Sequence, residues 1–529
     1  MLTFFVITPI IIATFLFIAS SNKAVRVLSI VFQSALFAAS AYLVLQTRET
    51  EIVTFVGTYD DVLGIILRAN TLSAVFVMLT TLIFLAVAVY TFNDARDKRS
   101  FWFLLFLMES SFIGLFLTGD LFNIFVLIEV STLVIVILTM YDRQRRNMFY
   151  GKVFLMANIV AVQFYLLGLG YIYRLTGALD MVRVAELLAD IPPESQLLPY
   201  VLIMTTLAFK CTLIPFFSWT PKVRLYPGSP TAVAAILSGL QIKSALYLFL
   251  RFQDIFGAIS SAEFFLIVGI ITGLFGAVMA ISQTDVKLIL AYHTVSQIGL
   301  IIIGVSAGHL YSHIGGLYHI ISHAMFKTTL FLSTGIICQS YGTSDVYKIR
   351  GVMRSMPLAG AATGMAVLGI AGAPFFIGSI SKYFIAYDVP LYLNAATIAI
   401  SLGTIVSFIK FSSMFMGKPE AKGGISKAPR SRSIPVVALG AACLLGGIFG
   451  TQIIYFLFRY EVQVVFTSYV QKSLIFAGSC IAGYFIYKHL VKGNGWLVKF
   501  GAMKFGFKTI CASIGAFFAA MLLLVGYVF

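Results

Sequence analysis

The chain has 529 residues, of which 60% are hydrophobic and only 11% are charged. Soluble proteins typically contain about 25% charged residues, so this composition excludes a soluble globular fold and predicts a polytopic membrane protein. The formal net charge of +16 is explained by basic loops beside a membrane, and we expect lipids rather than nucleic acid as partners. The five cysteines are dispersed without a CxxC pair, which supports neither a disulfide framework nor an iron–sulfur site.

Apolar runs recur along the whole length of the chain. They predict an all-α fold of about 14 to 16 transmembrane helices, because the runs are long enough to cross a bilayer. The first run lacks a basic leader, so we expect a retained helix rather than a signal peptide. In chain order the predicted spans cover residues 2–20, 25–46, 71–93, 101–118, 121–140, 149–174, 198–218, 230–250, 258–281, 286–306, 312–339, 357–388, 391–416, 434–458, 472–490 and 505–528.

Lysine and arginine gather in alternate loops between the predicted spans. The loop after residues 121–140 carries Arg143, Arg145 and Arg146, whereas the next loop is acidic and includes Asp180. Because basic loops stay in the cytoplasm, this alternation predicts a multi-pass protein of the cell (inner) membrane with both termini outside.

Glu129 lies deep inside the predicted span 121–140. A carboxylate buried without a partner keeps its proton, and a nearby lysine allows it to ionise. The position therefore predicts a switchable proton carrier. The alternative is a neutral glutamate that is hydrogen-bonded to a neighbouring helix.

Lysines such as Lys210, Lys243, Lys382 and Lys410 lie within predicted spans, where a charge costs at least about 2.5–3.5 kcal/mol near the helix centre. Lys210 and Lys243 lie near the middle of their spans, which favours proton exchange over a side chain that snorkels to the membrane surface. Lys382 and Lys410 lie nearer to a span end, and for both of them snorkelling stays open as the alternative.

Two predicted spans contain a helix breaker. Pro215 follows Lys210 in one span, and Pro374 precedes Lys382 in another, between Gly372 and a second glycine. Proline inside a membrane helix frees a carbonyl and interrupts the hydrogen-bond ladder. Broken helices at matching places in two halves are typical of inverted-repeat transporters with a site near the membrane midplane.

The two breaks lie five spans apart, and this spacing predicts two inverted repeats of five helices each. An odd number of helices per unit places the two repeats in opposite orientations. The expected units are the N-terminal helices (1–100), the first repeat (101–250), the second repeat (258–416) and the C-terminal helices (434–529).

The segment HIISHAMFK places His319, His323 and Lys327 on one helical face. A zinc site would need a third ligand, and no acidic residue or cysteine lies nearby, so a proton relay is favoured over metal or over satisfied core histidines. His293 has Thr294 and other polar neighbours in its span, which indicates a hydrated interior or, alternatively, a packing role.

The antiporter-like subunits of respiratory complex I resemble this chain in several segments that follow the same order, as do those of Mrp-type cation/proton antiporters and membrane-bound hydrogenases. The segments are DLFNIFVLIEVSTL, the Lys–Pro of span 198–218, KSALYLFLRF, DVKLILAYHTVSQIGLI, HIISHAMFKTTLFLSTG and GAPFFIGSISK. The resemblance covers about residues 70–420. The segment AYHTVSQIG is most similar to the Mrp D-type and hydrogenase-type branch.

The resemblance implies a role for each buried charge. Glu129 and Lys210 would form the pair at the centre of one half-channel, and Lys243 would connect it to the histidine and lysine face beginning at His319. Lys382 would lead to the outer half-channel. The resemblance thus implies a proton-translocating subunit that works with other membrane subunits, with Na⁺ as the expected exchanged cation.

This chain departs from the family pattern in three places. Lys222 and Arg224 replace the Asp and His that the family often has after the first break, so a proton-uptake role for that loop is in doubt. Ala373 and Ser379 replace a proline and an aromatic residue near the second break. Two predicted spans also exceed the usual fourteen and would form a docking element or a branch-specific extension.

Three classes of function fit the sequence. The leading hypothesis is a cation/proton antiporter subunit that is not catalytic by itself and has no cofactor; the first alternative is a proton- or sodium-pumping subunit of a redox complex. A stand-alone solute symporter would also have broken helices and midplane charges. A structural membrane scaffold would tolerate neutral substitutions at Lys210 and Lys243.

Overall fold

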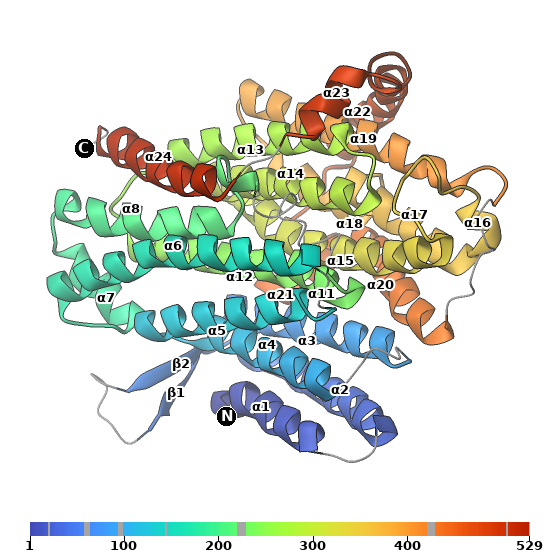
Figure 1. Cartoon of the computed structure of the whole chain (residues 1–529). Coiled ribbons are helices and arrows are strands. Elements are labelled where there is room, and N and C mark those ends of the chain that lie inside the picture. Colours follow the sequence, from blue (N-terminus) through green and yellow to red (C-terminus); the bar gives the residue numbers. More distant parts are fainter. Residues whose placement is uncertain are drawn as a thin grey trace.

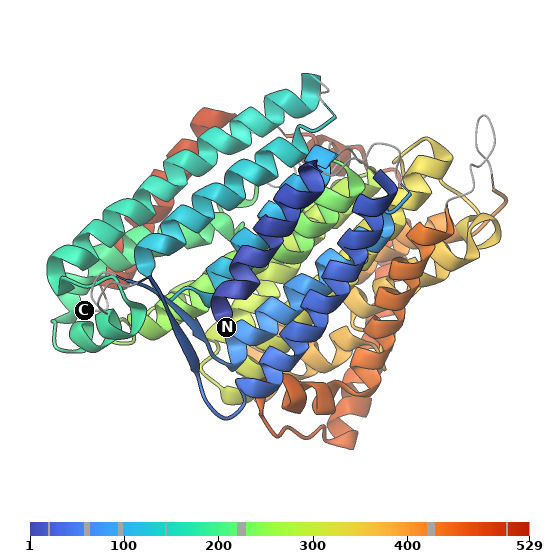
Figure 2. The ribbon, with the colours of Figure 1, turned by 90° about the horizontal axis from the view of Figure 1, so that it is seen from below.

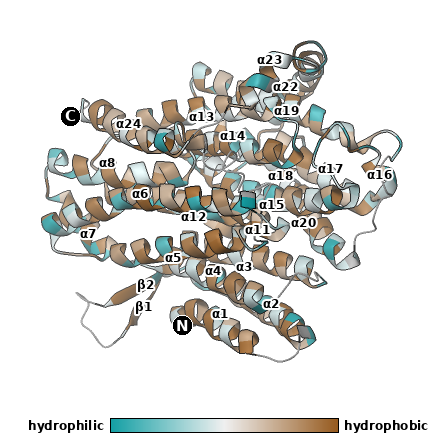
Figure 3. Ribbon diagram, viewed as in Figure 1, coloured by the Kyte–Doolittle hydropathy of each residue, from teal (hydrophilic) through white to brown (hydrophobic). Residues whose placement is uncertain are grey.

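The computed structural model describes residues 1–18, 22–57, 64–93, 99–142, 145–218, 229–419, 429–503 and 506–527. Long helices dominate it and run roughly side by side, along the horizontal direction of Figure 1 and obliquely in the turned view of Figure 2. Hydrophobic residues cover most of their length (Figure 3). Within the described ranges, thirteen helices are long and apolar enough to cross a membrane.

The long helices of the first part of the chain are α1 (Leu2–Ile18), α2 (Asn22–Gln46), α3 (Thr71–Thr91), α4 (Arg99–Leu117), α5 (Leu121–Thr139), α6 (Arg145–Thr176), α8 (Pro193–Lys210), and α11 (Thr231–Ile236) with α12 (Ile242–Ile255). Those of the second part are α13 (Ala262–Ser282), α14 (Val286–Ser306), α15 (Leu310–Tyr341), α17 (Pro357–Ala371), α19 (Leu391–Ser412), α20 (Arg430–Ile448), α22 (Phe466–Ile486) and α24 (Phe507–Gly526), with the nine-residue helices α18 (Ile377–Ile385) and α21 (Gly450–Phe458) between them. The short helices are α7 (Met181–Ala189), α16 (Val352–Ser355) and α23 (Gly495–Gly501).

These helices agree with the predicted spans. Three predicted spans are not among the thirteen candidate membrane helices: they correspond to α1, which has 17 residues, to α8, and to α17 followed by α18. The all-α prediction is confirmed in its essentials. The exception is a small antiparallel hairpin of β1 (Ile52–Val56) and β2 (Ile65–Ala69), too short to leave an apolar run.

Both predicted helix breaks are confirmed. The α8 helix ends at Lys210, Thr212 adopts a left-handed backbone with φ of 60°, and the 3-10 turn η1 (Phe216–Ser218) follows Pro215. The α17 helix ends before Gly372, whose φ of 85° terminates it, and α18 begins three residues after Pro374. Each break leaves backbone carbonyls without helical partners, and these carbonyls attract cations.

The two halves repeat a local arrangement at opposite ends of the bundle. Both α6 and α15 have 32 residues and are followed by a glycine with φ of 66°. An aspartate follows each glycine and forms an isolated backbone bridge with an N-cap aspartate. Asp180 pairs with Asp120, the N-cap of α5, and Asp345 pairs with Asp285, the N-cap of α14. The first bridge adjoins α7 at the left of Figure 1, and the second precedes α16 at the right.

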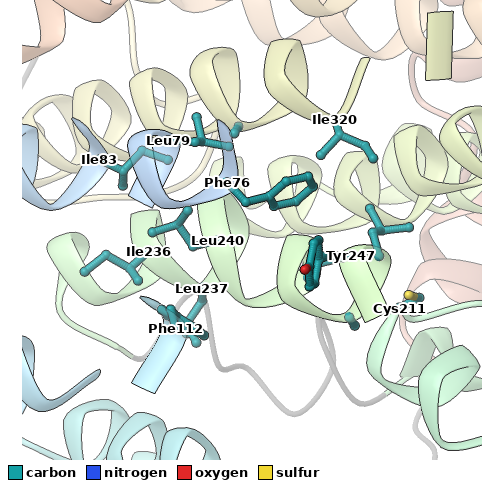
Figure 4. Packing of buried hydrophobic residues seen from close by; sticks show 14 of the residues in the cluster. Phe76, Leu79, Ile83, Phe112, Cys211, Ile236, Leu237, Leu240, Tyr247 and Ile320 are labelled. Atoms are coloured by element: carbon teal, nitrogen blue, oxygen red, sulfur yellow. The ribbon is translucent and has the colours of Figure 1, made fainter. Parts of the chain in front are cut away.

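The centre of the bundle is formed by α11, α12 and α15, whose apolar windows are completely buried. Figure 4 shows Phe76 of α3 close to Tyr247 of α12 and Ile320 of α15. The rings of Phe76 and Tyr247 lie 5.3 Å apart, and the Tyr247 hydroxyl donates to the carbonyl of Phe116 at 2.9 Å. This close packing fixes α12 and α15 in the core, and these helices carry four of the nine residues of the predicted proton path.

The C-terminal helices lie at the periphery and adjoin the two breaks. The ring of Phe517 on α24 lies 5.0 Å from that of Phe216 in η1. Tyr469 on α22 accepts a hydrogen bond from the backbone nitrogen of Phe375 at 3.0 Å. Both chain termini lie at the same end of the bundle in Figures 1 and 2.

Candidate functional site

Lys210 lies at the last position of α8, beside the first helix break. Its amine is buried and donates to Thr132 Oγ1 of α5 at 2.9 Å. The free carbonyls at a helix C-terminus stabilise a positive charge, which explains how a lysine is tolerated here. The break therefore holds the predicted cation inside the bundle rather than at its surface.

Glu129 lies on α5 three residues before Thr132, and residues at this spacing share a helical face. Its Oε1 atom is buried and has no hydrogen-bond partner among the described residues. The sequence predicted a Glu129–Lys210 pair; the structure brings both residues to the same region, but the lysine amine contacts Thr132 instead of the carboxylate.

A small cavity of about 20 Å³ joins Lys210 to the central helices. Thr132, Gln241 and Ser244 line it together with Lys210. This volume holds about one water molecule, and the lining offers polar partners for it. Water in this cavity would connect the first break with the neighbourhood of Lys243.

Lys243 follows a π-helical turn, η2 (Leu237–Gln241), that interrupts α11 and α12. Its side chain is 0% exposed, and its amine contacts the backbone carbonyl of Ser238 and Nδ1 of His323. A π-helical turn removes the ordinary i to i+4 partner of a carbonyl, which makes the Ser238 oxygen available to the lysine. Hydropathy gave no signal of this turn, and sequence reasoning missed it.

The three titratable residues on the predicted face of α15 each contact a different set of partners. His319 bonds to Ser381 of α18 at 2.8 Å through Nδ1 and to Gln297 of α14 at 3.1 Å through Nε2. The amine of Lys327 donates to the carbonyl of Leu290 on α14. With His323 on Lys243, this one helix joins α12, α14 and α18 through titratable side chains.

His293 lies on α14 and faces α19. Its Nε2 atom contacts the Ser407 hydroxyl, and its ring stacks on Phe408 with a centroid distance of 4.5 Å. Nδ1 is buried without a hydrogen-bond partner in the described part of the chain. The stacked ring is a packing contact, and a role of His293 in a hydrated proton path stays a prediction.

Lys382 and Lys410 both bind helix-end carbonyls rather than snorkel. Lys382 donates to Ile370 and Ala371 at the end of α17, at 2.9 and 3.1 Å. Lys410 is buried and donates to three carbonyls at the end of α13, those of Ala280, Ile281 and Gln283. The snorkelling alternative is therefore wrong for Lys410, whose amine caps a helix inside the protein.

Asp120 lies outside the membrane-spanning helices, as the N-cap of α5. Burial raises the pKa of Asp120 above its ordinary value, the backbone N–H groups of Asn123 and Phe122 lower it, and the nearby Asp180 raises it again. Asp180 is itself paired with Arg68 of β2 at 3.3 Å. Arg68 of the hairpin thus places a positive charge beside the two aspartates at the N-terminal end of α5.

Glu109 is a buried carboxyl that sequence reasoning overlooked. It lies on α4, where Oε2 accepts a hydrogen bond from Gln33 of α2 and Oε1 has no partner among the described residues. The segment LMESSF lies in a predicted span, so the same apolar-context signal that selected Glu129 would have found it.

Two further expectations concern the loop after the first break and metal binding. Lys222 and Arg224 lie outside the described residues, so the structure does not place that loop. Among the described residues no three His, Cys, Asp or Glu side chains lie together in an arrangement that holds a metal ion.

A family model described as the transmembrane region of NADH:quinone oxidoreductase and Mrp antiporter proteins matches residues 118–410. The chain belongs to this family. The match begins just before α5 and ends at Lys410, so it includes all nine proposed proton-path residues and leaves the C-terminal helices outside.

Curated relatives come from both branches that the family description names. The chain is 28% identical over 480 residues to the D-type protein of the Na⁺/H⁺ antiporter of Alkalihalophilus pseudofirmus, covering 87% of this chain and 95% of the relative. It is 29% identical over 487 residues to the N-type protein of the NADH-quinone oxidoreductase of Desulforudis audaxviator, covering 84% of this chain and 96% of the relative.

Solved structures share the fold of this chain. A chain of the Mrp complex from Dietzia sp. superimposes with a TM-score of 0.80 at 23% identity, covering 90% of this chain and 99% of the other. A chain of respiratory complex I from Thermus thermophilus superimposes with a TM-score of 0.77 at 20% identity, covering 91% of this chain and 100% of the other. At these identities the likeness establishes the architecture.

The buried contacts of the proposed proton-path residues all lie within the part of the chain that the family model matches. The described titratable groups make a sequence of separate buried contacts: Lys210 with Thr132 near Glu129, Lys243 with His323, and His319 with Ser381, the residue before Lys382. Such a sequence is costly to bury and does not contribute to folding as an apolar core would.

Proposed function

We propose that this chain is the proton-translocating, antiporter-like subunit of a multi-subunit complex, a Na⁺/H⁺ antiporter in the first instance. The observation that carries the proposal is the buried contact between Lys243 and His323, which joins the helices of one half to those of the other. The Na⁺/H⁺ antiporter relative of Alkalihalophilus pseudofirmus, matched over 87% of this chain, supports the same assignment.

In this proposal protons move laterally along the buried chain between two hydrated half-channels. Glu129 and Lys210 form the control point: the lysine amine either contacts Thr132, as here, or moves to the free Oε1 of Glu129. Contact with the lysine favours the ionised carboxylate and loss of it favours the protonated acid, so each exchange takes up or releases a proton.

Lys243, His323 and His319 then pass the proton toward Lys382. Each has a neutral and a protonated form and a hydrogen-bond partner on a neighbouring helix, as a relay requires. The electrostatic field along this path is set by three further residues on or beside it, His293, Lys327 and Lys410. The repeated glycine and aspartate arrangement after α6 and α15 supports the proposed pair of inverted repeats, residues 101–250 and 258–416.

We further propose that both termini face the outside of the cell membrane. The alternation of basic and acidic loops supports this orientation, and the position of both termini at one end of the bundle in Figure 1 agrees with termini on one side of the membrane. In this orientation the acidic loop containing Asp180 and the loop containing Asp388 are external, and the basic segments before α6 and α20 are cytoplasmic.

A redox-driven pump is the second candidate. The 29% identity to an NADH-quinone oxidoreductase protein favours it. An antiporter complex and a redox-driven complex would use the same proposed path in this chain. No cofactor is assigned to this chain, so in both cases partner subunits would supply the driving reaction.

Everted membrane vesicles that contain the whole complex test the proposal. Addition of NaCl to acidified vesicles should raise the internal pH in an antiporter, whereas an electron donor should acidify the vesicles in a redox pump. Purification then identifies the co-purifying subunits. Neither response, together with purification as a free-standing monomer, would refute a role in either complex and favour a symporter.

A further inference from the structure

A lateral cavity of about 130 Å³ lies beside the second helix break, between α18, α19 and α22. Its lining contains two lysines, Lys382 and Lys472. Hydroxyl and amide side chains complete the polar part of the wall: Ser379, Asn394, Thr397, Ser401, Tyr469, Ser473 and Ser479. Most of the remaining wall is apolar, so water in this space would lie against these polar side chains.

Lys472 comes from α22, which lies outside the residues that the family model matches. Its amine donates to the carbonyls of Tyr383 and Ala386 at the end of α18, at 3.1 and 2.8 Å, and lies 5.1 Å from the centre of the Tyr383 ring. Lys382 is held in the same manner at the end of α17. The cavity thus contains two amines, each placed by the C-terminal carbonyls of a short helix.

The helix that carries Lys472 is otherwise weakly anchored. Most residues of α22 are exposed on the bundle surface, and its packing partner is α19. Its polar contacts concentrate at the cavity, where Tyr469 bonds to the backbone of Phe375 and to Ser379 at 3.0 Å each. Lys472 is the one charged residue of α22, and a charge within a membrane-spanning helix is costly, so its position requires an explanation.

The titratable and charged side chains that face the cavity are Lys382, Lys472, Tyr383 and Tyr469. None of the described lining residues is Asp or Glu. The cavity therefore offers a proton two amines and no carboxylate among its lining residues.

We propose that Lys472 is a further proton-carrying group. It receives protons from Lys382 and releases them along the side of the path that α22 forms. This inference rests on the proposed proton-translocating function. It adds a residue and a helix beyond the family match to the terminal part of the path, on the side of the external Asp388 loop in the proposed orientation.

The transfer step is balanced. The ammonium of Lys382 gives one proton to cavity water, and the neutral amine of Lys472 takes one proton from the same water chain. Lys472 then releases that proton outward and returns to the amine, while Lys382 is reprotonated from the His319 side. One proton moves through the cavity in each cycle, and no other reactant is consumed.

Lys472 also caps α18, so the test must separate proton exchange from positioning. Arginine keeps the positive charge and can donate to the same carbonyls, but its guanidinium stays protonated. Lys472→Arg therefore preserves the capping role and removes the exchangeable amine. Lys488→Met is the matched control, because Lys488 lies in the π-helical turn η4 (Tyr487–Val491) that follows α22, is exposed and does not line the cavity.

The measurement is the initial rate of proton transport in proteoliposomes that contain the purified complex, with thermal stability of each variant recorded in parallel. We expect Lys472→Arg to fold with an unchanged thermal midpoint and to transport protons roughly 100-fold more slowly. Lys488→Met should transport at the wild-type rate.

Two outcomes would overturn the inference. A wild-type rate in Lys472→Arg, with a loss confined to Lys472→Met, would show that Lys472 only positions α18. Absence of proton movement in the wild-type complex would refute the proposed function itself, and the assignment of Lys472 with it. The wild-type and arginine samples therefore distinguish failure of the function from failure of the residue assignment.

Discussion

Replacing Lys243 by methionine tests the contact between Lys243 and His323, which joins the two halves of the chain. The Lys243 side chain is 0% exposed, and its amine contacts His323 Nδ1 and the carbonyl of Ser238. Methionine has a similar length and fills the same space, but it cannot carry a proton. The variant interrupts the proposed path at one point while leaving the surrounding helices in contact.

The magnitude follows from two opposing terms. A buried charge replaced by an apolar side chain of similar volume is neutral to stabilising by about 1–4 kcal/mol. The acceptors left unpaired at His323 and Ser238 cost about 1–3 kcal/mol. These contributions offset each other, so we expect a nearly unchanged thermal midpoint. A positioned proton-transfer group accelerates its step by about 10²–10⁴-fold, so transport should fall at least about 100-fold.

Proteoliposomes with the purified complex provide the assay, with Na⁺-driven proton flux and thermal stability measured on the same preparation. Arg251→Met is the control, because Arg251 lies on the same helix about two turns further, where its guanidinium contacts Met181. A Lys243→Met complex that transports at more than half the wild-type rate would refute the relay and favour a structural scaffold.

Three further predictions concern stability, each measured as a thermal midpoint in detergent. The raised pKa of Asp120 means that the folded state holds its proton more tightly than the unfolded state, so wild-type stability falls as the pH rises above the ordinary aspartate range. Asp120→Asn keeps the helix cap and should gain stability over the wild type as the pH rises toward neutral; a difference independent of pH would contradict this. A Cβ at Gly299 would lie 2.4 Å from the backbone nitrogen of Gly273, so Gly299→Val should separate α13 and α14 at a cost of about 1–3 kcal/mol, and an unchanged midpoint would contradict the close packing. Lys410→Met should lower the midpoint by leaving three carbonyls at the end of α13 without a donor, in contrast to Lys243→Met, and equal midpoints for the two variants would be inconsistent with the capping role.

Features governed by local chemistry were predictable from the sequence. The predicted span 286–306 coincides with α14 because apolar composition over that length decides where a helix crosses a membrane. The breaks at Pro215 and Pro374 followed from the missing backbone donor of proline. Glu129 and Lys243 were recognised because a charge in an apolar run has no local compensation.

Features that depend on contacts between distant segments were not predictable. The partner of Lys210 was expected to be Glu129, but the choice between Glu129 and Thr132 depends on the relative position of α5 and α8. Lys410 appeared near a span end, where hydropathy cannot distinguish snorkelling from a cap on α13. Lys472 fell at the start of a predicted span, and only the approach of α22 to α18 gives it a role.

The most direct test of the proton relay is the substitution of Glu129 by glutamine in the intact complex. Glutamine preserves the size and hydrogen-bonding capacity of the side chain but cannot exchange a proton, so the complex should assemble with all its subunits. Proton flux in proteoliposomes is the measurement. The account predicts that Glu129→Gln abolishes flux while the subunit composition stays unchanged; a fully assembled variant with normal proton or sodium flux would contradict it.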